Sequence, residues 1–132
     1  MTQKQPTVMV VEDEKLLLDA ITKKLVISNV EVIPCSSGQE ALQQLKALQH
    51  LPHAIWLDYY LKDMNGLAFM EEVKKDPAWA EIPVVVVSNS ASEKKVHHML
   101  ALGVKKYILK AEYRLDEILA IIQELIADNK NN

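Results

Sequence analysis

The chain has 132 residues and a formal net charge of −3 at pH 7, with 49% hydrophobic and 25% charged residues. This composition is ordinary for a globular domain with one substantial core, and the mild negative charge argues against a nucleic-acid binder, which needs a concentrated basic surface. The start MTQKQPTV is polar and its first apolar run is far too short to span a membrane, so we expect neither a signal peptide nor a membrane anchor. The single cysteine, Cys35, excludes an internal disulfide, and a free thiol fits the cytoplasmic location that we predict.

Short apolar runs rich in β-branched residues recur along the chain at 7–11, 30–33, 54–57, 82–87 and 106–109. They mostly lack polar alternation, which is typical of strands buried on both faces. Between them, apolar residues recur at helical spacing, as at Leu17, Ile21 and Leu25 and most clearly from 115 to 126.

Helix start and stop signals agree with this division. Ser37 with Glu40, and Ser90 with Glu93, each match a capping box, and Gly103 is typical of a helix C-terminus. Strands separated by helices of this length predict βαβ units, and therefore an α/β fold with a doubly wound parallel sheet covered on both faces. No linker divides the chain, so we expect one domain over 1–132, with an ordered core of about 6–128 and a frayed polar tail.

Polar residues stand directly after four of the five predicted strands. They are Glu12 and Asp13, Asp58, Ser88 and Lys110. In open α/β sheets ligands gather at the carboxyl ends of the strands, so these side chains are expected to converge. Carboxylates brought together repel unless a cation neutralises them, and hard oxygen ligands favour Mg²⁺ over Zn²⁺. This set would suit phosphoryl transfer. Asp58 would be the nucleophile, its acidic neighbours would hold a metal, and Ser88 and Lys110 would face an anionic group.

Each residue also has an ordinary structural interpretation. An acidic pair after a strand often caps a helix or interacts with its dipole, Asp58 and Ser88 could be turn or cap residues, and Lys110 could be a solvated charge. The functional interpretation depends on their conjunction, because each position follows a different strand and their chemistries fit one reaction.

Five segments in this order resemble the receiver domain of bacterial two-component response regulators, including the single-domain chemotaxis type. They are VMVVEDE, SSGQEAL, WLDYYLKDMNG, IPVVVVSNS and GVKKYILKAE. The resemblance covers nearly the whole chain. It implies a flavodoxin-like (βα)5 three-layer sandwich with strand order 2-1-3-4-5, and a signalling phosphoacceptor, not an enzyme in the usual sense.

The resemblance implies that Asp58 accepts a phosphoryl group from a histidine kinase or a histidine phosphotransfer protein. Mg²⁺ would be bound by Asp13, Asp58 and the backbone carbonyl of Tyr60, with Glu12 acting partly through water.

Three further roles follow from the same resemblance. Lys110 would pair with the phosphoryl oxygens, Ser88 would donate a hydrogen bond to the phosphoryl group, and Tyr107 would be the switch aromatic that turns inward as the serine moves. The alternative for Tyr107 is a half-buried strand tyrosine.

The sequence departs from the family pattern in three places. Ala111 follows Lys110 where a cis proline is usual, and we expect a trans bond because a non-proline cis bond costs about 3–4 kcal/mol. Lys62 replaces a proline in the loop after the acceptor, which predicts a less stiff loop. Asn89 replaces a very small residue, and would either narrow the approach to Asp58 or hydrogen-bond the phosphoryl group.

Tyr60 lies two residues after Asp58, and the resemblance implies that this position borders the path of the hydrolytic water. A large ring there would screen that water and predicts slow self-dephosphorylation. The alternative is a tyrosine that simply lies on the surface.

The family's output face comprises the fourth helix, fifth strand and fifth helix. It carries a basic cluster of Lys94, Lys95, His97, His98, Lys105 and Lys106 beside Tyr107. This cluster would steer an acidic downstream protein or is only a solvated face. With no output domain expected, the simplest account is a stand-alone regulator acting through protein contacts, without direct nucleic-acid or membrane binding. A receiver excised from a longer protein would have the same sequence features.

Two other functions compete with this prediction. A phosphorylation-independent pseudo-receiver would be an interaction module with a degenerate site, against which the intact acidic, serine and lysine set argues. A flavodoxin-like enzyme or cofactor carrier would need a phosphate-binding loop where Glu12 and Asp13 would repel phosphate.

Overall fold

Five parallel strands form one sheet in the order β2-β1-β3-β4-β5 in the computed structural model, which describes residues 5–130. The strands are β1 (Thr7–Val11), β2 (Glu31–Cys35), β3 (Ala54–Asp58), β4 (Val84–Ser88) and β5 (Lys106–Leu109). The helices that follow them are α1 (Lys15–Ile27), α2 (Gly38–Ala47), α3 (Gly66–Lys74), α4 (Glu93–Ala101) and α5 (Leu115–Lys130). Short 3-10 turns, η1 (Trp79–Glu81) and η2 (Lys110–Glu112), precede β4 and follow β5. The predicted doubly wound (βα)5 fold and its strand order are confirmed.

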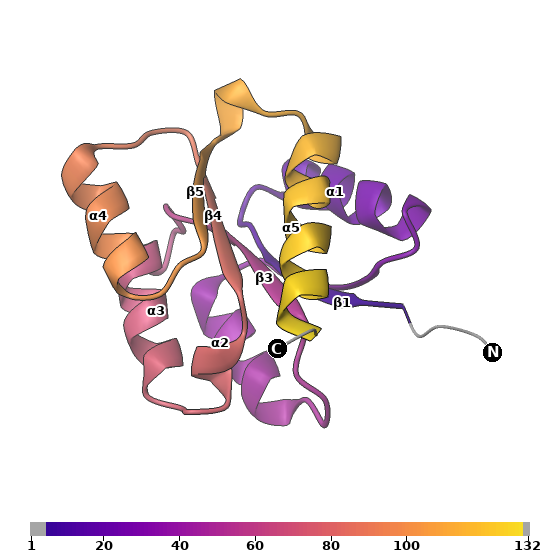
Figure 1. Ribbon diagram of the computed structural model, residues 1–132, viewed down its shortest axis with the longest axis horizontal. Helices are drawn as coiled ribbons and strands as arrows, with labels where there is room; N and C mark the ends of the chain where they lie inside the picture. Colours follow the sequence, from indigo (N-terminus) through magenta and orange to yellow (C-terminus); the bar gives the residue numbers. More distant parts are fainter. Residues whose placement is uncertain (1–4, 131–132) are drawn as a thin grey trace.

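Helices cover both faces of the sheet, with α1 and α5 on one side and α2, α3 and α4 on the other (Figure 1). Alternate residues of each strand therefore enter different cores. Val10 and Trp56 pack with α1 and α5, whereas Met9 and Leu57 pack with α2, α3 and α4. Both faces of the central strands are buried, which explains why their sequences are continuously apolar.

Several element boundaries differ from the prediction; β4, for example, begins at Val84 and not at Ile82. Strand β2 extends to Cys35 and includes Pro34. A proline is tolerated there because β2 lies at the edge of the sheet and pairs with one strand only, so the N–H that proline lacks is not needed for a second neighbour. Helix α5 continues to Lys130, so it includes part of the tail that was expected to fray beyond residue 128. Asn131 and Asn132 lie outside the described residues, and within residues 5–130 no helix combines the length and apolar character that crossing a bilayer requires.

The predicted cap of α2 is confirmed and that of α4 is wrong. Ser37 caps α2, and its hydroxyl accepts a hydrogen bond from the backbone N–H of Glu40 at 3.0 Å. Helix α4 begins later than expected, at Glu93, and its cap is Ser92, which accepts from the N–H of Lys95 at 3.2 Å. Ser90 belongs to the preceding loop. Gly103 follows α4 with a φ of +98°, as a helix-ending glycine should.

Cys35 ends β2 and is completely buried. Burial, reinforced by the nearby Glu40 carboxylate, raises the pKa of its thiol to about 12. The thiol is therefore protonated at neutral pH, and it packs as a small apolar side chain in the core beneath α2.

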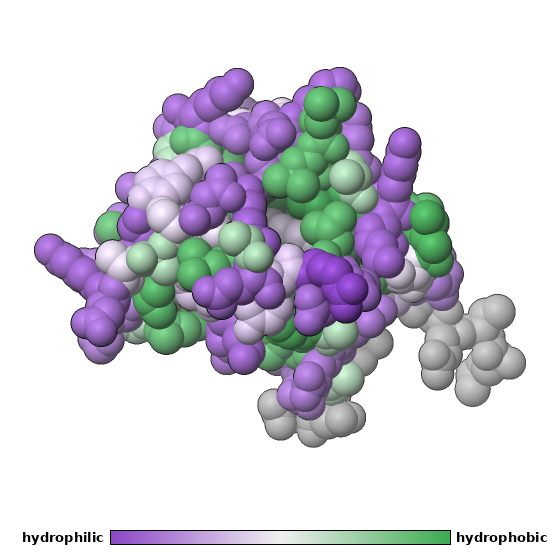
Figure 2. All heavy atoms as spheres, turned by 90° about the horizontal axis from the view of Figure 1, so that it is seen from above, coloured by the Kyte–Doolittle hydropathy of each residue, from purple (hydrophilic) through white to green (hydrophobic). Residues whose placement is uncertain are grey.

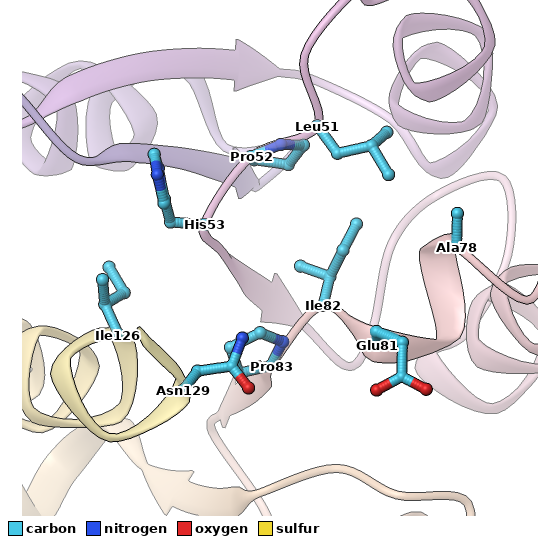
Figure 3. Close-up of a pocket in the computed structure, with 9 residues that line it drawn as sticks. All are labelled: Leu51, Pro52, His53, Ala78, Glu81, Ile82, Pro83, Ile126 and Asn129. Atoms are coloured by element: carbon cyan, nitrogen blue, oxygen red, sulfur yellow. The ribbon is translucent and has the colours of Figure 1, made fainter. Parts of the chain in front are cut away.

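A hollow of about 260 Å³ lies at the amino ends of β3 and β4, at the opposite end of the sheet from the residues singled out above. Figure 3 shows Pro52, Ile82, Pro83 and Ile126 around it. The Nδ1 atom of His53 accepts a hydrogen bond from the N–H of Thr7 at 3.0 Å, so this imidazole is part of the strand framework.

Replacing Ser92 by Ala should lower the free energy of unfolding by about 1 kcal/mol, because the first turn of α4 loses its side-chain cap. Urea denaturation measures the change. Ser90→Ala is the matched control and should cost less, and a larger loss for Ser90→Ala would contradict the assignment of the cap.

Candidate functional site

Three carboxylates from two neighbouring strands meet where the strand order reverses. Glu12 and Asp13 follow β1, and Asp58 is the last residue of β3, which pairs with β1. The backbone N–H of Glu12 donates to the carbonyl of Cys35 at 3.0 Å and thereby extends the β1–β2 ladder. One oxygen from each of the three carboxylates lies within 4.8 Å of the others. The predicted acidic cluster therefore exists, at the carboxyl edge of the sheet, the side of the molecule that Figure 2 shows from above.

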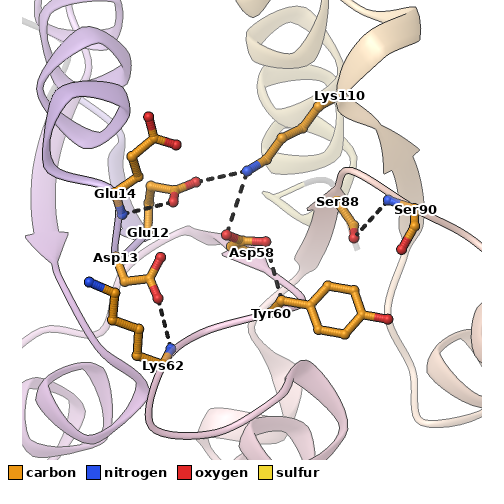
Figure 4. A network of polar contacts seen from close by, with 9 residues as sticks. All are labelled: Glu12, Asp13, Glu14, Asp58, Tyr60, Lys62, Ser88, Ser90 and Lys110. Atoms are coloured by element: carbon orange, nitrogen blue, oxygen red, sulfur yellow. Dashed lines mark hydrogen bonds and ion pairs between the residues drawn. The ribbon is translucent and has the colours of Figure 1, made fainter.

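Lys110 is the cation of this cluster. It begins the turn after β5, and its Nζ lies 3.1 Å from Oε1 of Glu12 and 3.5 Å from Oδ2 of Asp58 (Figure 4). Burial works against the charge of Lys110, but Asp58 and Glu12 outweigh it and raise its pKa, so the ammonium remains charged. The peptide bond between Lys110 and Ala111 is trans, as predicted.

One ammonium does not balance three carboxylates, and Asp58 shows the consequence. Burial and then the charge of Glu12 raise the pKa of Asp58 to about 6, against the opposing effects of Lys110 and of the Tyr60 N–H, which donates to Oδ1 at 3.3 Å. Glu12 and Asp58 are only 2% and 7% exposed. The site thus has an excess of negative charge in a poorly solvated place, which a divalent cation would offset.

The loop from β3 to α3 is tethered to the acidic cluster at the position where the family has proline. The backbone N–H of Lys62 donates to Oδ2 of Asp13 at 2.7 Å. A proline has no N–H and could not form this bond.

A second tether joins the same loop to α2. The Asp63 carboxylate accepts from the N–H groups of Gly38 and Gln39 at 3.0 and 2.9 Å, at the N-terminus of that helix. Desolvation is the largest single effect on Asp63 and raises its pKa, but these two N–H groups, together with those of Asp63 itself and Met64, outweigh it and lower the pKa. Asp63 therefore binds the helix as a carboxylate. The expectation of a less stiff loop did not include these two tethers.

The remaining predicted site residues lie at the end of β4, in the loop after it and in β5, and they differ in exposure. Ser88 ends β4 and is completely buried, and its hydroxyl accepts from the N–H of Ser90 at 3.4 Å. Asn89 is exposed in the following loop. Tyr107 is partly buried, and its hydroxyl donates to the carbonyl of Ser90 at 2.8 Å, the arrangement of a half-buried strand tyrosine.

Tyr60 is 51% exposed but does not lie free on the surface. Its hydroxyl is hydrogen-bonded to the Lys95 ammonium, and its ring contacts Tyr59 edge-on with 4.9 Å between centroids. Lys95 therefore differs from the rest of the predicted basic cluster, of which Lys94, His97, His98, Lys105 and Lys106 are exposed. Sequence reasoning placed Lys95 only in that cluster and did not single out Asp63, because the partners of both lie more than twenty residues away along the chain.

Comparison with known proteins agrees with this geometry. Residues 8–123 match the response regulator receiver domain family. Two-component response regulator ORR12 of Oryza sativa subsp. japonica is 35% identical over 105 residues, which cover 80% of this chain and 86% of the relative. The chain therefore belongs to the response regulator receiver domain family, whose members act generally as signalling phosphoacceptors.

Solved structures agree with the fold. A CheY-like receiver domain protein from Methanospirillum hungatei JF-1 superposes with a TM-score of 0.86 at 21% identity, covering 96% of this chain and 98% of that one. The phosphorylated cyanobacterial phytochrome response regulator RcpA is 30% identical, with a TM-score of 0.77 and coverage of 92% and 91%.

Replacing Asp58 by Asn should stabilise the metal-free protein at neutral pH. Because the folded-state pKa of about 6 lies above the ordinary value of 3.8, the folded protein holds this proton more tightly, and its free energy of unfolding falls as the pH rises between these values. We expect Asp58→Asn to gain on the order of 2 kcal/mol at pH 7.5, since a tenfold difference in proton affinity corresponds to about 1.4 kcal/mol and Lys110 loses one partner. The gain should vanish near the ordinary pKa of about 3.8.

Urea denaturation in a chelating buffer at several pH values measures this difference. An Asp58→Asn variant that is less stable than the wild type at pH 7.5 would contradict the assigned charge imbalance.

Proposed function

We propose that this chain accepts a phosphoryl group on Asp58 from a histidine kinase or a histidine phosphotransfer protein. The observation that carries the proposal is the position of Asp58, which lies between two further carboxylates and the Lys110 ammonium at the carboxyl edge of the sheet. A carboxylate oxygen of Asp58 would attack phosphorus, a P–O bond would form as the P–N bond of the donor breaks, and the histidine would leave after taking up a proton.

The donor set fits Mg²⁺. Three carboxylates supply hard oxygen ligands, their atoms lie within 4.8 Å, and two opposite ligands of Mg²⁺ stand about 4 Å apart. We propose that Asp13, Asp58 and the Tyr60 carbonyl would hold the ion, with Glu12 acting partly through water. Bound Mg²⁺ would supply neutralisation of the charge that develops in phosphoryl transfer.

The residues around Asp58 have proposed roles in holding and sensing the phosphoryl group. Lys110 would pair with its oxygens, and the buried Ser88 hydroxyl would donate a hydrogen bond to it. Tyr107 would be the switch residue of the α4–β5–α5 face. Tyr60 and Asn89 would set the lifetime of the phosphorylated state, Tyr60 by screening the hydrolytic water.

The α4–β5–α5 face would signal to a downstream protein, and its exposed basic residues would favour an acidic partner. We propose a single receiver domain over 1–132, acting in the cytoplasm without direct contact with nucleic acid or membrane.

Incubation with acetyl phosphate and Mg²⁺, followed by intact mass measurement, tests the central step. We expect one phosphoryl adduct on the wild type and none on Asp58→Ala, because Asp58 is the proposed acceptor and lies beside Lys110 and the other two carboxylates. Chelation of Mg²⁺ should prevent the adduct. A wild-type protein that remains unmodified would favour the pseudo-receiver instead.

Lys62→Pro should weaken Mg²⁺ binding relative to Lys62→Ala. Both variants lose the side-chain charge, but only proline removes the N–H that orients Asp13. The loss of one hydrogen bond to a carboxylate predicts a difference of about three- to tenfold in dissociation constant. Calorimetric titration with MgCl₂ measures it, and equal affinities of the two variants would show that the tether does not orient Asp13.

A further inference from the structure

The Lys95 ammonium lies against two tyrosine rings of the acceptor loop. Its Nζ is 4.8 Å from the centroid of the Tyr59 ring and 4.4 Å from that of Tyr60, within the range of cation–π attraction. It is also hydrogen-bonded to the Tyr60 hydroxyl. This bond raises the pKa of Lys95, which therefore keeps its charge. The three side chains form a contact between α4 and the loop that follows Asp58.

This contact fixes the direction of the Tyr60 side chain. The Tyr60 N–H is bonded to Asp58, and from there the ring extends beside Ser88 and Ser90, from the loop after β3 towards the loop after β4 (Figure 4). A ring that is 51% exposed on a loop would ordinarily exchange rotamers freely. Here the edge of Tyr59 supports one side and Lys95 holds the hydroxyl end.

We propose that Lys95 is a positioning residue that holds the Tyr60 ring across the approach to Asp58 and thereby slows loss of the phosphoryl group. The inference rests on the proposed function. In the step concerned, a water oxygen attacks phosphorus, the bond between phosphorus and the Asp58 oxygen breaks, and phosphate leaves with the proton released to solvent. Lys95 acts only through Tyr60 and touches none of the reacting atoms.

Decay of the phosphorylated protein after removal of acetyl phosphate tests this role, followed by intact mass in Mg²⁺ buffer. Lys95→Gln and Tyr60→Phe should each accelerate decay about three- to tenfold, the effect of losing one charge-assisted hydrogen bond. The double variant should decay no faster than the faster single variant, because both changes break the same contact. Tyr60→Asn, which removes the ring, should accelerate decay at least as much.

Two controls separate this contact from a general effect of charge. Lys46→Gln removes the same charge from an exposed lysine of α2, outside the α4–β5–α5 face, and should leave the decay rate unchanged. Lys95→Arg retains a cation and its donors, and should restore a rate within about twofold of the wild type.

A second measurement does not require phosphorylation. The Lys95 ammonium protons should exchange with water more slowly in the wild type than in Tyr60→Phe, as measured by ¹⁵N NMR of the side chain. Equal exchange, wild-type decay in Lys95→Gln, or additive effects in the double variant would each overturn the role of Lys95. If the Lys95 ammonium protons exchange slowly but the wild-type protein takes up no phosphoryl group, the contact exists and the proposed function is refuted. The effect on phosphoryl lifetime is then refuted with it.

Discussion

The structure of this receiver domain is organised around an unbalanced charge cluster, in which three carboxylates face one ammonium at the edge of the sheet. Such a cluster costs stability when it is buried, and the raised pKa of Asp58 reflects that cost. The two central strands fix the carboxylates, and the turn after β5 brings in Lys110. Because the sheet and both helical layers hold these carboxylates in place, they cannot reduce their repulsion by moving apart. A bound cation would reduce it instead.

The loop after β3 shows how one family geometry can be maintained by different means. This chain has Lys62 where a proline is usual, and the lysine N–H bonds to Asp13 while Asp63 bonds to the start of α2. Three hydrogen bonds to carboxylates join the loop to the residues after β1 and to the start of α2, whereas a proline restricts only its own backbone. The tethers also couple the position of the loop to the charge state of the acidic residues, which a proline would not do.

Much of the fold and the placement of the central site residues were predictable from the sequence. Continuous apolar runs mark strands buried on both faces, and a parallel sheet brings their carboxyl ends to one edge, so Glu12, Asp58 and Lys110 were expected to meet. Local signals were less reliable. Ser90 and Ser92 both precede the fourth helix within a few residues, and only the backbone path distinguishes the capping residue. The contacts of Asp63 and Lys95 join separate loops and helices, and no local pattern encodes such a pairing.

The buried state of Cys35 has a practical consequence. It is the chain's single cysteine, it is completely buried, and its thiol is protonated at neutral pH. Reagents that modify cysteine thiolates should therefore not react with Cys35 in the folded protein. A cysteine introduced at an exposed position of α4 would be a unique attachment point for a fluorophore or spin label, so movements of that helix can be followed without first removing a native thiol.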